Sequence, residues 1–298
     1  MSRPRLLVTG GSGQLASALA VGADDLDLCR VGRPDFDFDR PETIDSAFHA
    51  AAPALVVNAA AYTAVDAAES DAESADRANR AGPARLAALC AASGVPLIHV
   101  STDYVYDGAK GAPYVETDPT APQGVYGASK LAGEAAVLAS GARAMVLRTS
   151  WVYAATGRNF VRTMLAAGLT RDRLTVVADQ KGCPTAAIDL AAAILAIARR
   201  ILADGWQPAF GGVFHAAGTG WTTWYGLAVA TFAEAAAHQR GRKVPVVEPI
   251  ATLQWPTPAK RPADSRLDCG KLQRVFGVRL PPWQDALART IAAMDLPS

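Results

Sequence analysis

The stretch RLLVTGGSGQLA at residues 5–16 decides the fold. Its apolar start, residues 5–9, predicts a short buried strand, and the glycines at positions 10, 11 and 13 predict a tight turn into an alanine-rich helix. Together these form a phosphate-binding site, because glycines let the backbone approach a pyrophosphate and a helix N-terminus offers unpaired N–H groups. The turn matches GxGxxA from Gly11, or TGxxGxxG from Thr9 with Ala16 as the last small residue. We therefore expect a dinucleotide on this turn, with Gly10 and Gly13 among its contacts.

The next predicted strand, residues 26–31, ends beside Arg33. In a nucleotide-binding fold this end meets the adenosine ribose, where an acid binds a free 2′-OH and an arginine suits a 2′-phosphate. Arg30 and Arg33 therefore favour NADPH, and the alternative is that Arg33 is a solvated loop residue. A carboxylate and an aromatic ring after this strand commonly contact adenine in such folds. Asp37 and Phe38 are the candidates here, unless Phe38 only packs in the core.

Strands and helices alternate along the rest of the chain. Apolar runs predict further strands at residues 54–58, 96–101, 144–149, 174–178 and 212–216. Helices are expected at residues 71–93, from 126 onward, and at 159–169, 186–203 and 221–239. Residues 179–185 and the proline-broken stretch 255–268 are expected to be loops.

This order predicts an α/β protein with a Rossmann-type doubly wound parallel sheet and a smaller, interleaved C-terminal α/β substrate domain. The dinucleotide-binding domain would span residues 1–155, with residues 186–215 returning to it. The discontinuous substrate domain would span residues 156–298.

Tyr126 and Lys130 stand four residues apart at the start of a predicted helix. Positions i and i+4 share one helix face, so the phenol and the ammonium point into the same cleft. Free tyrosine has a pKa of about 10 and lysine of about 10.4, but a nearby ammonium lowers the pKa of the phenol. Thr102 lies at the end of the preceding strand, at the sheet edge where ligands bind in open α/β folds. An isolated YxxxK on an exposed helix arises easily by chance, but the hydroxyl before it and the glycine turn favour a proton-transfer site.

Two further side chains leave alternatives open. Asn79 lies inside a predicted alanine-rich helix, where asparagine costs roughly a few tenths of a kcal/mol against alanine. Either a polar role near the site explains it, or its side chain is exposed. Trp151 follows the strand at residues 144–149 and either lines a substrate pocket or covers the core. Residues 58–63 are mostly small, so we expect their backbone to approach the dinucleotide closely.

Composition excludes several classes of function. The 298 residues carry 29 Lys and Arg against 28 Asp and Glu, which indicates neither a nucleic-acid nor a membrane-surface partner. Four scattered cysteines without a CxxC spacing fit a reducing cytoplasm and not a structural zinc site. No apolar run approaches the ~20 residues that span a bilayer, and residues 6–8 are too short for a signal-peptide core. We expect a soluble cytoplasmic protein.

Longer motifs surround the tyrosine and the lysine. They are NAAAYTAVDAAES (58–70), STDYVYDG (101–108), YGASKLAGE (126–134), RTSWVY (148–153), GRNFVRTML (157–165), DQKGCPT (179–185) and PTPAKRPADSRL (256–267). With the glycine turn, they resemble the extended short-chain dehydrogenase/reductase superfamily and, within it, the dTDP-4-dehydrorhamnose reductase family. The resemblance runs from the first strand nearly to the last helix.

The resemblance implies a role for individual residues. The catalytic triad would be Thr102, Tyr126 and Lys130, with Tyr126 and Lys130 also holding the cofactor. Dinucleotide contacts would lie at Gly13, Gln14, Leu15, Asp37, Phe38, Ala61, Tyr62 and Thr63. Substrate contacts would lie at Thr102, Asp103 and Trp151. Some family members bind magnesium through an acid in the first helix, but residues 13–21 contain none, so no metal is expected.

The implied reaction is NADPH-dependent reduction of the C4 keto group of a dTDP-4-keto-6-deoxysugar, with dTDP-L-rhamnose as the product. NADH as the cofactor and a homodimer both stay open. One alternative is a reductase of another nucleotide-linked 4-keto sugar in a secondary-metabolite pathway, because pocket shape and not motif separates epimers. Another is a non-catalytic dinucleotide-binding regulatory subunit of the methionine adenosyltransferase type, which an intact triad disfavours.

Overall fold

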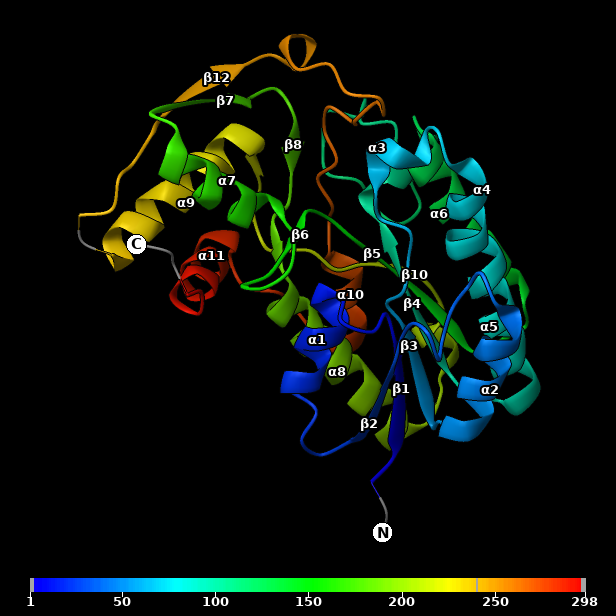
Figure 1. Cartoon of the computed structure of the whole chain (residues 1–298). Helices are drawn as coiled ribbons and strands as arrows, with labels where there is room; N and C mark the ends of the chain where they lie inside the picture. The colour runs from blue at the N-terminus through cyan, green and yellow to red at the C-terminus, as the bar shows by residue number, and fades with distance from the viewer. Residues whose placement is uncertain (1–2, 240, 296–298) are drawn as a thin grey trace.

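Six parallel strands form the central sheet (Figure 1). The computed structural model describes residues 3–239 and 241–295. The strands lie in the order β10, β5, β4, β3, β1, β2. The chain therefore adds β2 on one side of β1 and then crosses to the other side of β1, where it adds the other four strands. Such a reversal opens the crevice where open α/β sheets bind ligands. The predicted Rossmann-type sheet is confirmed, with strands β1 (Arg5–Thr9), β2 (Asp27–Val31), β3 (Leu55–Asn58), β4 (Leu97–Thr102), β5 (Ala144–Thr149) and β10 (Gly212–His215).

The carboxyl ends of the strands are in register within two neighbouring pairs, and β4 runs on to Thr102 beyond the end of β3, because Asn58 pairs with His99. β1 pairs with β3 at Thr9 and Asn58, and β4 pairs with β5 at Thr102 and Thr149. Parallel strands that end together bring the residues after them to the same edge of the sheet. Side chains from four distant parts of the sequence therefore converge there.

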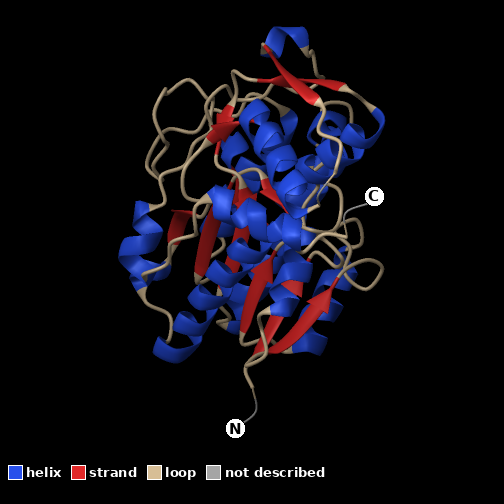
Figure 2. Ribbon diagram, turned by 90° about the vertical axis from the view of Figure 1, so that its left-hand side faces the viewer, coloured by secondary structure: helices blue, strands red, loops and turns tan. Residues whose placement is uncertain are grey.

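Helices cover both faces of the sheet, as Figure 2 shows. Strand residues alternate between the faces: Leu6 and Val8 pack toward α1 and α8, whereas Leu7 packs toward α2 and α5. Because both faces are buried, the strands are continuous apolar runs, which is why they were predictable to within about a residue. The covering helices are α1 (Gln14–Val21), α2 (Pro41–Ala51), α5 (Gly82–Ser93), α6 (Val125–Ala139) and α8 (Ala187–Asp204).

A second group of helices lies on the side of the strands' carboxyl ends (Figure 1). Their apolar faces share one core cluster, in which Leu165, Phe232 and Leu287 represent the three helices. Beside them β7 pairs in parallel with β12. The predicted limits of the two domains stay predictions, and residues 1 and 298 lie outside the described residues. The elements are α7 (Phe160–Thr170), α9 (Trp224–His238), α11 (Trp283–Ala292), β7 (Arg173–Val177) and β12 (Val246–Ile250).

Short elements connect the two groups. The stretch 179–185, which was predicted to be a loop, contains β8 and the start of β9, and these two-residue strands pair with β11 and β6. The short elements are α3 (Val65–Ala68), α4 (Ala72–Asp76), η1 (Arg77–Ala81), η2 (Asp103–Val105), η3 (Pro208–Phe210), η4 (Thr252–Gln254), α10 (Gly270–Phe276), β6 (Val152–Tyr153), β8 (Lys181–Gly182), β9 (Thr185–Ala186) and β11 (Thr222–Thr223).

The structure also differs from the sequence prediction in one helix and one strand. The helix predicted at residues 71–93 is interrupted by η1, a π-helical turn, between α4 and α5. A π-turn inserts one extra residue into a helix and is frequent at functional sites. Strand β12 was not predicted, because Pro249 interrupts its apolar run. A proline is tolerated there because β12 has only one neighbour, β7.

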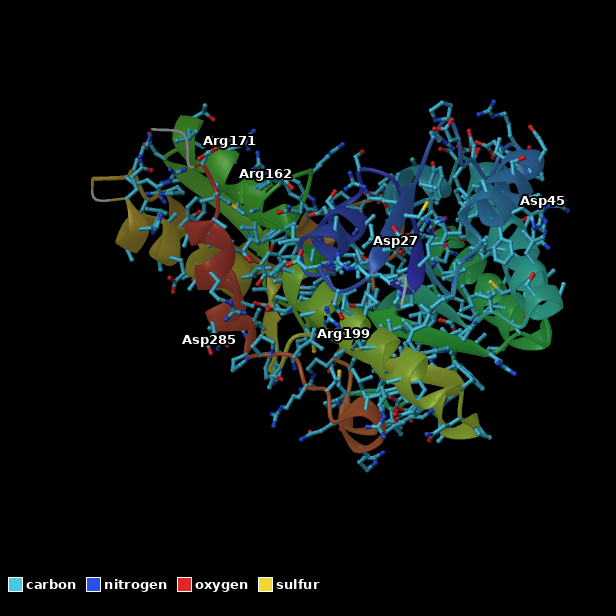
Figure 3. The ribbon with its side chains drawn as sticks, turned by 90° about the horizontal axis from the view of Figure 1, so that it is seen from below. Asp27, Asp45, Arg162, Arg171, Arg199 and Asp285 are labelled. Atoms are coloured by element: carbon cyan, nitrogen blue, oxygen red, sulfur yellow. The ribbon has the colours of Figure 1, made fainter. Side chains whose placement is uncertain are left out.

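Charged side chains lie mainly at the periphery, where Asp45, Arg171 and Asp285 are examples (Figure 3). Within residues 3–239 and 241–295, no helix combines the length and the apolar character needed to cross a membrane. The same residues contain no group of three or more His, Cys, Asp or Glu that could hold a metal ion.

Candidate active site

A cavity of about 1170 Å³ opens along the carboxyl ends of the sheet strands. Apart from Arg30, the residues predicted from the sequence for catalysis and for cofactor or substrate binding line it, although the role of each stays a prediction. Those residues are Gly10, Gly13, Gln14, Leu15, Arg33, Asp37, Phe38, Ala61, Tyr62, Thr63, Thr102, Asp103, Tyr126, Lys130 and Trp151. The fold thus gathers residues that are spread over the sequence from Gly10 to Trp151.

The glycine turn forms one wall of the cavity. Gly10 has φ +110°, and a Cβ there would lie 3.1 Å from the Ala59 backbone. A Cβ on Gly32 would lie 2.5 Å from the Cα of Gly11, so the end of β2 also approaches the turn closely. The first turn of α1 contains no acid and has no side-chain cap, and its residues Gln14, Leu15 and Ala16 line the cavity. An anionic phosphate is stabilised at such a helix start.

The segment that leads into α7 contacts the start of α1, next to the glycine turn. The Asn159 amide donates to Gln14 Oε1 at 2.8 Å, and Arg158 also lines the cavity. Sequence reasoning did not select either residue, although both belong to the quoted motif at residues 157–165. The cavity wall therefore continues from the glycine turn into the start of α7.

Tyr126, Thr102 and Lys130 meet at the centre of the cavity. Tyr126 and Lys130 project from the start of α6, and Thr102 ends β4. A hydrogen bond between the side chains of Tyr126 and Thr102 lowers the pKa of the phenol, and burial raises it more strongly. The Lys130 side chain is only 2% exposed, and its Nζ donates to the Val100 carbonyl at 2.7 Å.

The predicted effect of Lys130 on Tyr126 is wrong in this structure. Burial, together with the negative charge of Asp103, raises the pKa of Tyr126 to about 12. Burial lowers the pKa of Lys130 to about 8, although Glu134 acts in the opposite direction. The ammonium bonds the Val100 carbonyl instead of lowering the pKa of the phenol. Tyr126 therefore keeps its proton at neutral pH, which suits a proton donor better than a base.

Asp103 is a buried carboxyl group beside these residues. It is 2% exposed, and it accepts hydrogen bonds from Thr102 Oγ1 at 3.1 Å and Ser150 Oγ at 2.9 Å. Burial raises its pKa to about 6, against the opposing hydrogen bonds of Ser265, Ser150 and Thr102. Among the described residues no cation is paired with this carboxylate, so the folded protein binds its proton more tightly than the unfolded chain does.

We expect Asp103→Asn to stabilise the protein at pH 8 more than at pH 4. A carboxyl whose pKa rises from 3.8 to about 6 on folding contributes stability below pH 3.8, and this contribution is lost as the pH rises through about 6. The difference corresponds to about 3 kcal/mol as an upper estimate. Urea unfolding at both pH values measures it. Asp107→Asn is the control, and it should destabilise the protein more at pH 8 than at pH 4. The reason is that a hydrogen bond from Tyr114 lowers the pKa of Asp107 in the folded protein. An equal effect of Asp103→Asn at both pH values would contradict the expectation.

Two tryptophans form an aromatic wall. Trp151 stacks on Trp224 with ring centroids 3.5 Å apart and ring planes 6° apart. Trp151 has φ +48°, a left-handed conformation that is costly for a bulky residue and that occurs mainly at functional sites. Trp224 Nε1 donates to Gln180 Oε1 at 3.1 Å, which fixes its ring. Trp224 was not selected from the sequence, because nothing local indicates that the start of α9 reaches Trp151.

Asn79 has a polar role and is not exposed. Its side chain is 0% exposed and bonds the Tyr62 backbone through both its oxygen (2.9 Å) and its nitrogen (3.1 Å). Its nitrogen also donates to Ser129 Oγ on α6 at 3.0 Å. The π-turn η1 thus fixes the loop that follows β3 to the helix that carries Tyr126.

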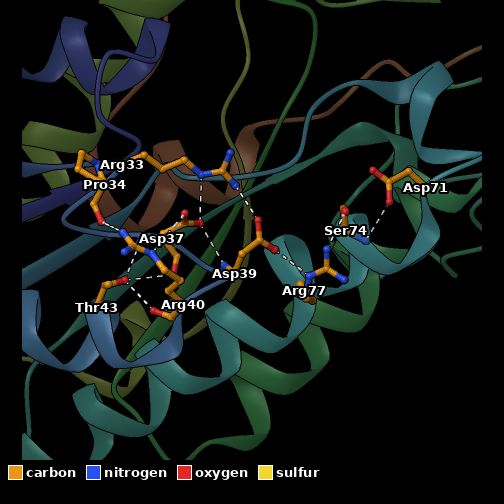
Figure 4. Close-up of polar contacts among 9 residues, drawn as sticks. All are labelled: Arg33, Pro34, Asp37, Asp39, Arg40, Thr43, Asp71, Ser74 and Arg77. Carbon is orange, nitrogen blue, oxygen red and sulfur yellow. Dashed lines mark hydrogen bonds and ion pairs between the residues drawn. The ribbon is translucent and has the colours of Figure 1, made fainter.

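A network of ion pairs lies at the far end of the cavity (Figure 4). Arg33 Nε and Nη2 bond Asp37 and Asp39, each at 3.0 Å. Arg77 Nε bonds the other oxygen of Asp39 at 2.7 Å. Phe38 lines the cavity and also packs on Phe36 with ring centroids 5.2 Å apart, and its contact with adenine stays a prediction. Arg30 is not in the cavity lining, and it bonds Ser17 instead.

Known proteins are similar to this chain along nearly its whole length. A family model described as RmlD substrate binding domain matches residues 4–296. The dTDP-4-dehydrorhamnose reductase of Sinorhizobium fredii is 47% identical over 293 residues, which are 98% of either chain. That of Burkholderia thailandensis is 45% identical over 95% of this chain and 96% of the relative. The structure of dTDP-4-dehydrorhamnose reductase from Bacillus anthracis in complex with NADP has a TM-score of 0.88 and 30% identity, and covers 97% of this chain and 99% of that one.

Proposed function

The chain belongs to the dTDP-4-dehydrorhamnose reductase family, and on this basis we propose that it reduces dTDP-4-dehydrorhamnose to dTDP-L-rhamnose with NADPH. The observation that carries the proposal is the position of Tyr126 beside Thr102, in the same cavity as the glycine turn. A proton donor and a phosphate-binding turn in one cavity are what a dinucleotide-dependent carbonyl reduction needs. The family relation favours this reaction over a non-catalytic regulatory role.

The cavity residues fit a dinucleotide. Gly10 and Gly32 let the glycine turn pack directly against the backbone at the ends of β2 and β3, which holds the turn at the edge of the sheet. The start of α1 would hold the pyrophosphate, and Asp37 and Phe38 would lie at the adenine. NADPH, when bound, supplies the hydride for C4 of the sugar. Lys130 Nζ uses one hydrogen bond for Val100, so two donors remain for the hydroxyls of the nicotinamide ribose.

Tyr126 is the proposed proton donor. As C4 is reduced, its carbonyl oxygen becomes an alkoxide, which is basic enough to take a proton from a phenol with a pKa of about 12. The Thr102 hydroxyl would hold the same oxygen by a hydrogen bond. In the free protein that hydroxyl donates to Asp103 at 3.1 Å, so its single hydrogen would turn from the carboxylate to the carbonyl oxygen when the sugar binds. Burial of these groups excludes water and strengthens each hydrogen bond.

A coupled assay tests the proposal. dTDP-4-dehydrorhamnose, prepared immediately before use by its epimerase, is added to the protein with NADPH, and loss of NADPH absorbance is followed. The product is expected to be dTDP-L-rhamnose by NMR. The keto sugar before epimerisation is the matched control for the choice between epimers. Absence of NADPH oxidation with the first sugar, or a preference for the second, would overturn the assignment.

We expect Trp151→Ala to raise KM for the keto sugar and to lower kcat, while NADPH affinity without sugar stays nearly unchanged. The exposed part of the stacked pair offers an apolar surface to the sugar nucleotide, and its loss lets the carbonyl drift from Tyr126. Trp224→Ala is the companion variant, since it removes the support of Trp151 without touching the glycine turn. NADPH titration and thermal unfolding of both variants separate binding from packing. If Trp151 only covered the core, truncation would cost about 3–5 kcal/mol of stability and weaken both ligands equally.

We also propose a cytoplasmic location, because all four cysteines are free. The homodimer stays an open prediction of the sequence.

A further inference from the structure

Asp39 joins two arginines across the far end of the cavity. Its Oδ2 pairs with Arg33 at 3.0 Å, and its Oδ1 pairs with Arg77 at 2.7 Å (Figure 4). Arg33 follows β2, whereas Arg77 begins η1, so the carboxylate connects two elements that are distant in the sequence. Arg33 and Asp39 both line the cavity, together with Ser74 and Ala78 from the helix that carries Arg77. The carboxylate therefore lies at the place where an adenosine ribose ends in this fold.

Charges around Asp39 are nearly balanced. Asp37, which pairs with Arg33 at 3.0 Å and with Arg40 at 4.0 Å, is the second acid. Glu73 lies 3.9 Å from Arg77, but its side chain is 94% exposed and contributes little. Arg77 also donates to Ser74 Oγ at 2.8 Å. Arg33, which lines the cavity, and Arg77 beside it are thus both already paired with an aspartate of the protein.

A 2′-phosphate and a 2′-hydroxyl meet this arrangement differently. An arginine binds phosphate through two parallel N–H groups. In Arg33 these are Nε and Nη2, which Asp37 and Asp39 occupy, and Arg77 gives its Nε to Asp39. A phosphate dianion must therefore displace the carboxylate or remain beside it, where the like charges repel. A neutral 2′-hydroxyl needs neither change, because a carboxylate can accept its hydrogen bond.

We propose that Asp39 is a cofactor-specificity residue, whose pairing with Arg33 and Arg77 reduces the preference for NADPH over NADH. This inference rests on the proposed dinucleotide function. Arg33 and Arg77 supply the attraction for the 2′-phosphate, and Asp39 offsets it. The protein consequently accepts both cofactors, with a ratio of affinities that the charge at position 39 sets.

The test is a titration of the full chain with NADPH and with NADH, comparing the wild type with Asp39→Asn. The amide keeps the shape of the side chain and removes its charge. The ratio of Kd for NADPH to Kd for NADH is expected to fall by about tenfold, the effect of removing one opposing charge. Competition by 2′,5′-ADP should strengthen by a similar factor, whereas competition by 5′-AMP should change much less.

Asp45→Asn is the matched control. Asp45 pairs with Arg85 through two hydrogen bonds at the outer surface and does not line the cavity (Figure 3). It should leave the ratio unchanged. Arg33→Ala and Arg77→Ala should each weaken NADPH by about tenfold or more and NADH by much less, as expected for the loss of a charge-assisted bond.

The outcomes separate this inference from the proposed function. An unchanged ratio in Asp39→Asn, or weaker NADPH binding, would overturn the role of Asp39 while leaving a dinucleotide-binding protein. A wild type that binds neither dinucleotide would overturn the proposed function itself. Should Asp39→Asn fail to fold, the two arginine variants decide the question, because equal losses of both cofactors would exclude a 2′-phosphate site.

Discussion

Tyr126→Phe is expected to lower kcat by ~10²-fold or more, the usual cost of losing a general acid. The substitution removes one hydroxyl, which hydrogen-bonds the Thr102 side chain. It keeps the ring, which packs edge-on against Tyr104 with ring centroids 5.5 Å apart. Folding and NADPH affinity should therefore change little. Steady-state rates with saturating sugar and cofactor, together with thermal unfolding, measure the effect.

Tyr104→Phe is the matched control for this experiment. Tyr104 lines the same cavity, so the variant removes the same atom from a neighbouring ring. Its kcat should fall far less than that of Tyr126→Phe. Similar losses in the two variants would show that the polarity of the cavity matters and not one proton donor. Retention of most activity by Tyr126→Phe would remove Tyr126 from the mechanism.

Glu134→Ala is expected to lower the free energy of unfolding by about 3–5 kcal/mol, because it leaves a buried guanidinium without its partner. Glu134 and Arg148 are 2% and 4% exposed, and Arg148 Nη2 lies 2.6 Å from Glu134 Oε2. Ser101 donates to the same carboxylate at 2.5 Å, and Arg148 Nη1 donates to the Tyr106 hydroxyl at 2.7 Å. Urea denaturation at neutral pH measures the loss.

Two further variants serve as the control and the rescue for Glu134→Ala. Asp25→Asn removes an exposed carboxylate that forms two hydrogen bonds with Arg199, so a much smaller change is expected. The double variant Glu134→Leu with Arg148→Met removes both buried charges and should recover part of the stability lost by Glu134→Ala. A stability loss in Glu134→Ala no larger than that in Asp25→Asn would contradict the role assigned to the buried pair.

The position of Glu134 connects this pair to the active site. Tyr126, Lys130 and Glu134 follow one another at intervals of four along α6, so they share one face of the helix. The charge of Glu134 raises the pKa of Lys130 and partly offsets the lowering by burial. Stability of the α6 core and protonation of Lys130 therefore depend on the same carboxylate.

Most of the sheet could be predicted from the sequence. Parallel strands covered on both faces must be apolar throughout, and the chain shows such runs at β1, β3, β4 and β5. The helix that carries Tyr126 and Lys130 was also predicted. On a helix, a spacing of four residues places both side chains on one face. β12 and the π-turn η1 were not predictable, since a proline hides the strand and no local pattern marks the extra residue.

The sequence by itself determined the parallel sheet, the glycine turn and the residues that meet at the carboxyl ends of the strands, because these depend on short apolar runs and fixed local spacings. Only the tertiary structure decided how those residues interact. It placed Trp224 on Trp151 and Arg77 on Asp39, and it showed that burial raises the pKa of Tyr126. Such contacts join segments tens of residues apart, and desolvation depends on everything packed around a group. Neither long-range contacts nor desolvation can be inferred from the residues next to a given residue in the sequence.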